Sequence, residues 1–446
     1  MQLFRHKSPL ITGTIILTVT GFVSRFIGFF YRIFLSRIFG AEGMGIYQLI
    51  SPVLALSFSL TVAGMQTAIS KYVAGETVSK DYRSSASHLF TGFVLSMAAS
   101  VVCAVGIYCF SEPIAAYFLL EPRTAPLLRI IALSIPLATV HSCINGYFYG
   151  IRKTSVPSLC QLAEQLIRVG SVYVIYFFCS KRGMTPTISF AVVGLVIGES
   201  ASMLVSIIAV RAHFENAVPK NYGSLLKMNF TSFTETAKRL LTLALPLSLN
   251  RVIINFLQSI EAIFIPNRLM SYGYDNAAAL SVYGVLTGMS LPLILFPSAI
   301  TNSICVLLLP IVSEADASDN VGTIKKAVHK SISYGFGLGV LFTSLFLLFG
   351  RFLGQFLYQS TLAGSFILVL SFLCPLMYIA STLNSILNGL GKTGATFTYS
   401  MISLLVRLCF VFLAIPKFGI HGYLIGLIAS QMVQTLLCMF AVRKYR

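Results

Sequence analysis

Ionisable side chains interrupt stretches of this chain that are otherwise apolar. Arg25 and Arg32 lie within the run LITGTIILTVTGFVSRFIGFFYRIFLSRIFG at 10–40. Seven residues are nearly two helical turns, so both guanidinium groups point to one side of a helix. An arginine at mid-bilayer costs roughly 2.5–3.5 kcal/mol on insertion scales, so it normally faces a partner or a water-filled cavity. Because arginine binds phosphate through paired hydrogen bonds, we interpret this face as the wall of a cationic, anion-binding cavity.

Further cavity candidates lie in later apolar stretches. Arg251, in LPLSLNRVIINFLQSIEAIF, opens the second half of the chain much as Arg25 opens the first. A structural hydrogen-bonding role for Arg251 is the alternative. The residues predicted to bind substrate in the cavity are Arg25, Arg32, Arg251, Asn250, Asn255 and Arg407.

Three acidic residues also fall in apolar stretches. Glu164 and Arg168 are four residues apart, so we expect a structural ion pair on one helix face. Glu261 is either the partner of an arginine from another helix or a site for a proton or cation. Glu199 is either a protonatable group facing a cavity or a buried, hydrogen-bonded acid. Scattered Cys and His residues and the absence of a CxxC motif argue against a metal site.

The composition is that of an integral membrane protein. Hydrophobic residues make up 56% of the 446 residues and charged residues only 10%, and the mean hydropathy is +0.83. Windows of about 20 apolar residues predict twelve spans. They are 9–36, 44–67, 87–110, 125–149, 157–179, 188–211, 240–267, 278–309, 328–350, 362–389, 395–416 and 421–442.

The distribution of the 32 Lys and Arg residues predicts the topology. Most of them fall in inside segments if the N-terminus is cytoplasmic, so the positive-inside rule places both termini in the cytoplasm. The net charge of +18 is then membrane-surface charge rather than a sign of nucleic-acid binding. We expect a multi-pass protein of the bacterial cytoplasmic membrane.

An internal repeat relates the two halves of the chain. The stretch 135–170 aligns with 374–409 at an offset of 239 residues and matches Pro136 with Pro375 and Arg168 with Arg407. Ser403 stands where the first half has Glu164. We therefore expect Arg407 to lack a partner on its own helix and to face either a cleft or phospholipid head groups. The offset advances the chain by six spans, an even number, so the repeat is parallel.

The predicted fold is therefore an all-α membrane protein with about twelve transmembrane helices in two six-helix lobes. The predicted domains are an N-terminal lobe at 1–211, a cytoplasmic interlobe linker at 212–239 and a C-terminal lobe at 240–446. A parallel repeat implies a central cleft between the lobes, which suits alternating access.

Several stretches are recognisable. GFVSRFIGFFYRIFLSRIFGAEGMGIYQLISPV (21–53), YGVLTGMSLPLILFPSAITNSICVLLLPIVSEA (283–315) and QLAEQLIRVGSVY (161–173) resemble the stage V sporulation protein B-like polysaccharide exporters. That group is part of the multidrug, oligosaccharidyl-lipid and polysaccharide (MOP) exporter superfamily, with the lipid II flippases and the MATE transporters. The resemblance implies a role in sporulation or cell-wall biogenesis, with cavity-lining arginines on the first helix. The motif SRFIGF matches Arg25 to one of these cavity-lining arginines of the resembling proteins. Arg32 is one residue out of register with their second arginine.

The resemblance implies a flippase for an undecaprenyl-pyrophosphate-linked oligosaccharide or peptidoglycan precursor. The expected partners are this lipid-linked glycan, membrane lipids and glycan-synthesis enzymes. We expect no cofactor, and we expect the functional unit to be a monomer. The alternative is a cation-coupled multidrug antiporter of the MATE type, although arginines outnumber acids in the predicted spans. An enzyme is the third and weakest hypothesis, because the outer loops are short and no paired nucleophile and base stands out.

Overall fold

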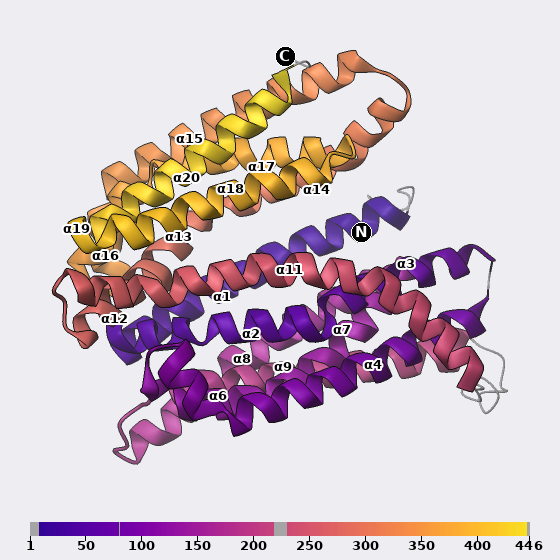
Figure 1. Ribbon diagram of the computed structural model, residues 1–446, viewed down its shortest axis with the longest axis horizontal. Coiled ribbons are helices and arrows are strands. Elements are labelled where there is room, and N and C mark those ends of the chain that lie inside the picture. Colours follow the sequence, from indigo (N-terminus) through magenta and orange to yellow (C-terminus); the bar gives the residue numbers. More distant parts are fainter. Residues whose placement is uncertain (1–8, 80, 218–229, 444–446) are drawn as a thin grey trace. The chain divides into compact units, whose positions relative to one another are not determined.

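The computed structural model describes residues 9–79, 81–217 and 230–443 (Figure 1). Within these ranges the chain is helical and contains no β-strand. The helices of the first half are α1 Pro9–Leu49, α2 Ser51–Phe58, the π-helix η1 Ser59–Ala63, α3 Gly64–Ser79, α4 Tyr82–Cys109, α5 Ser111–Pro113, the π-helix η2 Ile114–Phe118, the 3₁₀-helix η3 Pro122–Thr124, α6 Ala125–Ala132, α7 Ser134–Gly150, α8 Ser155–Lys181 and α9 Ser189–Ala217.

The second half repeats this succession of long and interrupted helices. It comprises α11 Phe230–Tyr272, α12 Asn276–Gly284, the π-helix η4 Val285–Ser290, α13 Leu291–Leu295, α14 Ser298–Ala317, α15 Val321–Tyr358, α16 Thr361–Leu370, α17 Leu373–Gly389, α18 Thr393–Leu413, α19 Ile415–Phe418 and α20 Ile420–Ala441.

Ten helical stretches in the described residues are long and apolar enough to cross a membrane, or up to twelve if two bent pairs count as one span each. The prediction of about twelve spans is confirmed, but the helices divide differently from the prediction. The first two predicted spans form one stretch, Ile16–Thr77, of 62 residues. A single span needs about 20 residues, and Gly40 at φ 68° breaks the helix inside this stretch. The predicted span 278–309 is instead divided, since α13 ends at Leu295 and α14 begins at Ser298.

The two bent pairs lie at matched positions of the repeat. The axis turns by 45° between Pro122–Ala132 and Ser134–Gly150, and by 51° between Thr361–Leu370 and Leu373–Gly389. Each bend comes just before a matched proline, Pro136 or Pro375, which cannot donate to the carbonyl four residues earlier. In the second pair the freed carbonyl of Ser371 accepts a hydrogen bond from the Thr343 hydroxyl at 2.9 Å. The two copies of the repeat are thus bent at equivalent positions.

Close packing at glycine also follows the repeat. A Cβ on Gly150 would lie 2.8 Å from the Ser70 carbonyl oxygen, and one on Gly389 would lie 2.9 Å from the Leu309 carbonyl oxygen. Both the glycines and their contacts are 239 residues apart. Gly389 is the last residue of α17.

The described residues fall into two compact units. The first contains those within Met1–Gly28 and Leu49–Ser259, and the second those within Phe29–Gln48 and Ile260–Arg446. Helices α1 and α11 thus contribute residues to both units. Residues 218–229 of the predicted linker lie outside the described part of the chain, and the flanking residues 212–217 and 230–239 continue α9 and α11.

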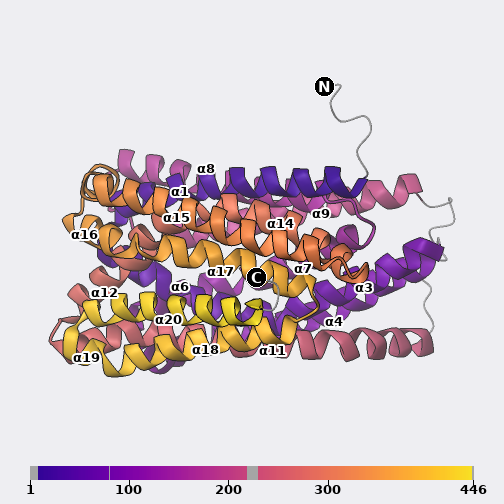
Figure 2. The ribbon, with the colours of Figure 1, turned by 90° about the horizontal axis from the view of Figure 1, so that it is seen from above.

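Each unit has its own buried core. In the first unit, α3 and α7 bury Ile69, Tyr147 and Phe148, each at most 1% exposed. In the second unit, α14, α15 and α17 bury Val312, Val328 and Leu383, which are fully enclosed. Within this unit α18 and α20 run side by side in both views (Figures 1 and 2). These cores hold the helices that carry the ionisable residues described next.

Candidate functional site

The residues of the first helix lie in different units. Arg25 belongs to the first unit, and its side chain is exposed. Among the described residues its guanidinium group has no hydrogen-bond or ion-pair partner. Gly21 and Gly28 lie about one helical turn to either side of Arg25. A Cβ on either glycine would meet nothing within 4 Å. This face of α1 is therefore not packed against protein in the first unit.

Arg32 has a different environment, within the second unit. Its side chain is half-buried, and its charge interacts with the phenol groups of Tyr47 and Tyr358. One turn further on, Arg37 donates to the carbonyl oxygens of Phe356 at 2.6 Å and Leu357 at 2.9 Å. These carbonyls are in the last turn of α15, which has no backbone donors of its own for them. Arg37 therefore fastens α1 to the end of α15.

The three candidates on α11 do not have equal access to solvent. Asn250 and Arg251 are exposed, and among the residues described neither has a hydrogen-bond or ion-pair partner. Asn255 is half-buried, and its amide donates to the hydroxyl of Ser59 at 2.5 Å and to the carbonyl of Ala55 at 3.3 Å. The Asn255 amide thus bonds one side-chain hydroxyl and one backbone carbonyl where α2 meets the π-helix η1. This contact is structural.

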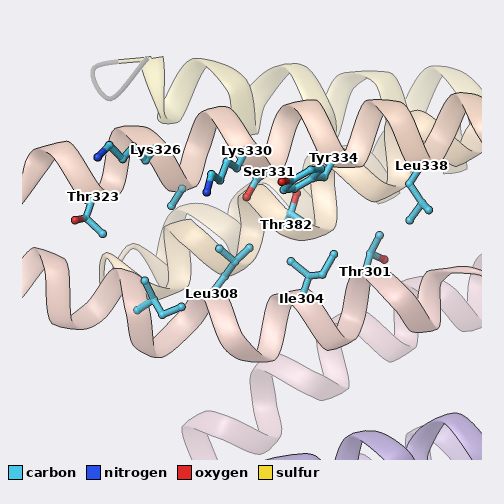
Figure 3. A pocket seen from close by; sticks show the side chains of 13 residues that line it. Thr301, Ile304, Leu308, Thr323, Lys326, Lys330, Ser331, Tyr334, Leu338 and Thr382 are labelled. Atoms are coloured by element: carbon cyan, nitrogen blue, oxygen red, sulfur yellow. The ribbon is translucent and has the colours of Figure 1, made fainter.

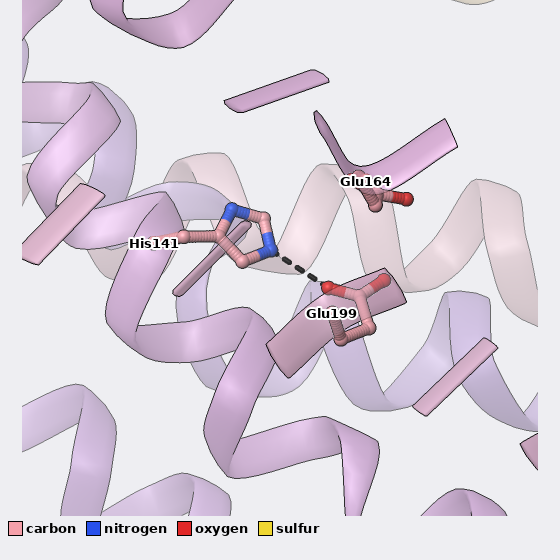
Figure 4. Close-up of side chains that lie close together, drawn as sticks. All are labelled: His141, Glu164 and Glu199. Atoms are coloured by element: carbon pink, nitrogen blue, oxygen red, sulfur yellow. Dashed lines mark hydrogen bonds and ion pairs between the residues drawn. The ribbon is translucent and has the colours of Figure 1, made fainter. Parts of the chain in front are cut away.

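Glu164 and Glu199 come together with His141 in one cluster at α7, α8 and α9 (Figure 4). Arg168 pairs with Glu164 on α8, as the four-residue spacing predicts, and its guanidinium group also lies 3.6 Å from Glu199. His141 Nε2 is 2.8 Å from the other Glu199 oxygen. Because an ionised carboxylate only accepts hydrogen bonds, Nε2 carries the proton in this contact. We call these four residues the His–Glu–Arg cluster.

The His–Glu–Arg cluster has donor atoms close enough together to bind a metal ion. The ligand atoms of His141, Glu164 and Glu199 all lie within 4.8 Å of one another. However, the guanidinium group of Arg168 contacts both carboxylates and supplies the positive charge that a cation would bring. The geometry is that of a buried ion-pair network rather than a metal centre.

A small cavity adjoins the cluster. It has a volume of about 130 Å³, and Glu199 lines it. Hydroxyl groups supply the rest of its polar lining, from Ser57, Thr61, Ser134 and Thr139. The Glu199 carboxylate is thus paired within the cluster and also lines a small cavity whose walls are mostly apolar.

The second unit contains a separate buried ion pair. Arg407 on α18 lies 3.1 Å from a carboxylate oxygen of Glu261 on α11, and Glu261 is 6% exposed. The Tyr423 hydroxyl of α20 donates to the other oxygen at 2.8 Å. Arg407 thus has its acidic partner on a different helix and not on its own, as the Ser403 position predicts. The alternative that Glu261 pairs with an arginine of another helix is confirmed.

The predicted residues therefore fall into two classes. Arg168 and Arg407, which the repeat matches, are both neutralised by carboxylates. Arg25 and Arg251 have no such partner among the described residues. Sequence reasoning missed His141 and Tyr423, although a lone histidine within an apolar span is a signal that points to His141.

Comparison with known proteins was made for the sequence and for the fold. Residues 10–316 match the model of a family described as "Polysaccharide biosynthesis protein". The chain is 28% identical to the stage V sporulation protein B of Bacillus subtilis (strain 168), over 98% of this chain and 84% of that protein.

Two solved structures share the fold. One is titled "Lipid II flippase MurJ, inward closed conformation", with a TM-score of 0.70, 17% identity and coverage of 96% of this chain and 87% of the other. The second is an inward-facing multidrug resistance MATE family transporter of the MOP superfamily, with a TM-score of 0.67, 17% identity and 94% coverage of both chains. At this identity the likeness concerns the fold alone.

Proposed function

Because this chain belongs to the polysaccharide biosynthesis protein family, and with it to the MOP superfamily of membrane transporters, we propose that it is a flippase for a lipid-linked glycan. Its substrate would be an undecaprenyl-pyrophosphate-linked oligosaccharide or peptidoglycan precursor. The chain is a multi-pass membrane protein and a transporter rather than an enzyme, as its relatives are. The sequence-based identification of the family and of the fold class is confirmed.

The observation that carries the proposal is the contrast between paired and unpaired arginines. Arg168 and Arg407 have carboxylate partners, whereas Arg25 and Arg251 have exposed guanidinium groups without one among the residues described. A cation in an apolar span that no acid neutralises favours an anionic ligand. A pyrophosphate group carries negative charge and oxygen acceptors that suit the planar guanidinium fork.

In the proposed cycle, the head group enters from the cytoplasmic side and engages Arg25 and Arg251 while the polyprenyl tail remains in lipid. Asn250, beside Arg251 in the same unit, is a further candidate for contact, and roles for Arg32 and Arg407 stay predictions. Alternating access would then open the site to the other side of the membrane. Outward movement of each negative charge gains about 2.3 kcal/mol per 100 mV of inside-negative potential, so the potential alone could bias export.

Coupling to protons, as in a cation-coupled antiporter, is the second candidate function. The His–Glu–Arg cluster favours it, because Glu199 is hydrogen-bonded to His141 and also lines a small cavity. A proton taken up by Glu199 would break its ion pairing with Arg168 and could reset the carrier. Glu261 is less suited to this role, since it is almost fully enclosed by Arg407 and Tyr423.

The experiment uses proteoliposomes that contain a fluorescent undecaprenyl-pyrophosphate sugar. Transfer of the head group is followed by its accessibility to an external enzyme, with and without a membrane potential. Removal of a charge-assisted contact of about 1.5–3 kcal/mol predicts a fall in transfer of roughly ten- to hundredfold for Arg25→Ala and for Arg251→Ala. Arg351→Ala, an exposed position near the end of α15, is the matched control and should transfer at the wild-type rate.

Other outcomes would contradict the flippase. Equal transfer by wild type and Arg25→Ala would remove Arg25 from the substrate path. Absence of transfer, together with proton-driven efflux of a cationic dye that Glu199→Gln abolishes, would favour the antiporter.

A further inference from the structure

A larger cavity lies in the second unit, and none of the candidate site residues described above lines it (Figure 3). Its volume is about 370 Å³, which falls within the range of roughly 300–1,000 Å³ typical of ligand sites. Helices α14 and α15 form its two long walls, and Thr382 of α17 lies at its back (Figure 3). All of its lining residues belong to one compact unit.

One end of this cavity is cationic. Lys326 and Lys330 are four residues apart on α15, and both side chains line the cavity (Figure 3). Neither ammonium group has a hydrogen-bond or ion-pair partner in the part of the chain that the structure describes. Thr323 and Ser331 line the same wall. This end therefore offers two uncompensated positive charges to an anion.

The remainder of the cavity is apolar. Ile304 and Leu308 of α14 line one wall, and Leu338 of α15 lies at the end of the cavity away from Lys326 (Figure 3). The lining residues Ile311 and Tyr334 are 49% and 63% exposed, so the cavity communicates with the outer, apolar surface of the unit. In a spanning protein such a surface contacts acyl chains, and tyrosine is enriched where the bilayer meets water.

The matching place in the first unit is closed. At the offset of 239 residues, the counterparts are Ser87 for Lys326, Thr91 for Lys330, Ile69 for Leu308 and Gly92 for Ser331. There Ile69 packs so tightly on α4 that a Cβ on Gly92 would lie 2.7 Å from its Cδ1 atom, and Thr91 is fully buried. Helices α3 and α4 thus pack directly where α14 and α15 enclose a cavity. The lysines and the cavity occur together, in the same copy of the repeat.

We propose that this cavity binds an anionic phospholipid of the surrounding bilayer. Its phosphate lies between Lys326 and Lys330, and one acyl chain lies between α14 and α15 against Ile304, Leu308 and Leu338. Basic pockets between transmembrane helices suit anionic lipid head groups. The apolar walls exclude a free anion as the natural occupant, and the two lysines distinguish an anionic lipid from a zwitterionic one. This site does not depend on what the protein transports.

The test measures lipid binding to the purified full-length protein in detergent by native mass spectrometry and by thermal shift. Phosphatidylglycerol is the probe and phosphatidylcholine the reference lipid. The double variant Lys326→Gln/Lys330→Gln should bind phosphatidylglycerol roughly ten- to thirtyfold more weakly, since each basic residue near the surface contributes a few-fold to affinity. Lys325→Gln is the matched control, because Lys325 is exposed on the same turn but does not line the cavity, and it should bind as wild type does.

A second variant separates loss of charge from loss of fold. Leu308→Phe fills the apolar part and leaves both lysines in place, so it should also weaken phosphatidylglycerol binding while the helical content is unchanged. Unchanged affinity in the double variant, or an equal loss in Lys325→Gln, would overturn the proposal. Displacement of the lipid by millimolar inorganic phosphate would show that the site binds simple anions and not a phospholipid. Binding of undecaprenyl phosphate, with no binding of phosphatidylglycerol, would assign the site to the transported substrate.

Discussion

At the scale of residues, the intramembrane charges are organised by their partners. Glu261 is nearly enclosed, and both of its oxygens are engaged, one by Arg407 and one by Tyr423. Three separate helices supply these groups. A buried ion pair contributes little net stability, yet removal of one partner leaves an uncompensated charge.

This asymmetry leads to a prediction for the Glu261–Arg407 pair. Arg407→Met should lower the free energy of unfolding by about 3–5 kcal/mol, because the Glu261 carboxylate stays buried without its cation. The double variant Glu261→Gln/Arg407→Met should recover most of that loss. Thermal unfolding of the purified protein in detergent measures both, with Arg351→Met as the exposed control. Additive losses in the double variant would show that the two residues are not coupled.

At the scale of elements, the repeat preserves contacts as well as sequence. The side chains of Asp81 and Asn320, 239 residues apart, both accept backbone hydrogen bonds at the N-termini of α4 and α15. The hydrogen bonds from Ser84 hold the pKa of the Asp81 carboxyl group below its ordinary value. Where the copies differ, as at Lys330 and its counterpart Thr91, the packing between the helices differs too.

Small residues decide how closely helices approach one another in a membrane protein. Within the second unit, a Cβ on Gly284 of α12 would overlap the Ala41 carbonyl and the Gly45 nitrogen of α1. A Cβ on Gly45 would in turn overlap the Leu280 carbonyl. Only glycine lets these backbones touch.

We therefore predict that Gly284→Val destabilises the protein by about 1–3 kcal/mol or more, because α1 must move away from α12. Gly337→Val is the matched control, since a Cβ on Gly337 of α15 would meet nothing within 4 Å. Its melting temperature in detergent should equal or exceed that of wild type. A similar loss in both variants would indicate a general intolerance of valine in these helices.

At the scale of the whole molecule, the orientation in the membrane is a prediction from the lysines and arginines. If both termini are cytoplasmic, Cys109 at the end of α4 faces outward and Ser318, between α14 and α15, faces inward. Both positions are exposed. The cavity with Lys326 and Lys330 would then open toward the cytoplasmic leaflet.

Cysteine labelling in intact cells tests this orientation. A variant that retains only Cys109 should react with a membrane-impermeant maleimide from outside. A variant with Ser318→Cys as its single cysteine should react only after permeabilisation. The reverse pattern would invert the topology and place the lysine cavity in the outer leaflet.

The amino-acid sequence by itself determined the membrane class, the approximate spans, the repeat and the family. Hydropathy, helical periodicity and the bends before Pro136 and Pro375 are local properties that the chain carries in its order of residues. The pairing of Glu164 with Arg168 belongs here as well, because four residues set it on one helix.

Only the tertiary structure decided which distant groups meet. His141 with Glu199, Arg407 with Glu261, and the open space between α14 and α15 all depend on how neighbouring helices are rotated and spaced. Close contacts between side chains of separate helices set that packing, and spacing along one helix does not encode them. For this reason Arg407 looked unpartnered in the sequence, although a glutamate 146 positions earlier neutralises it in the fold.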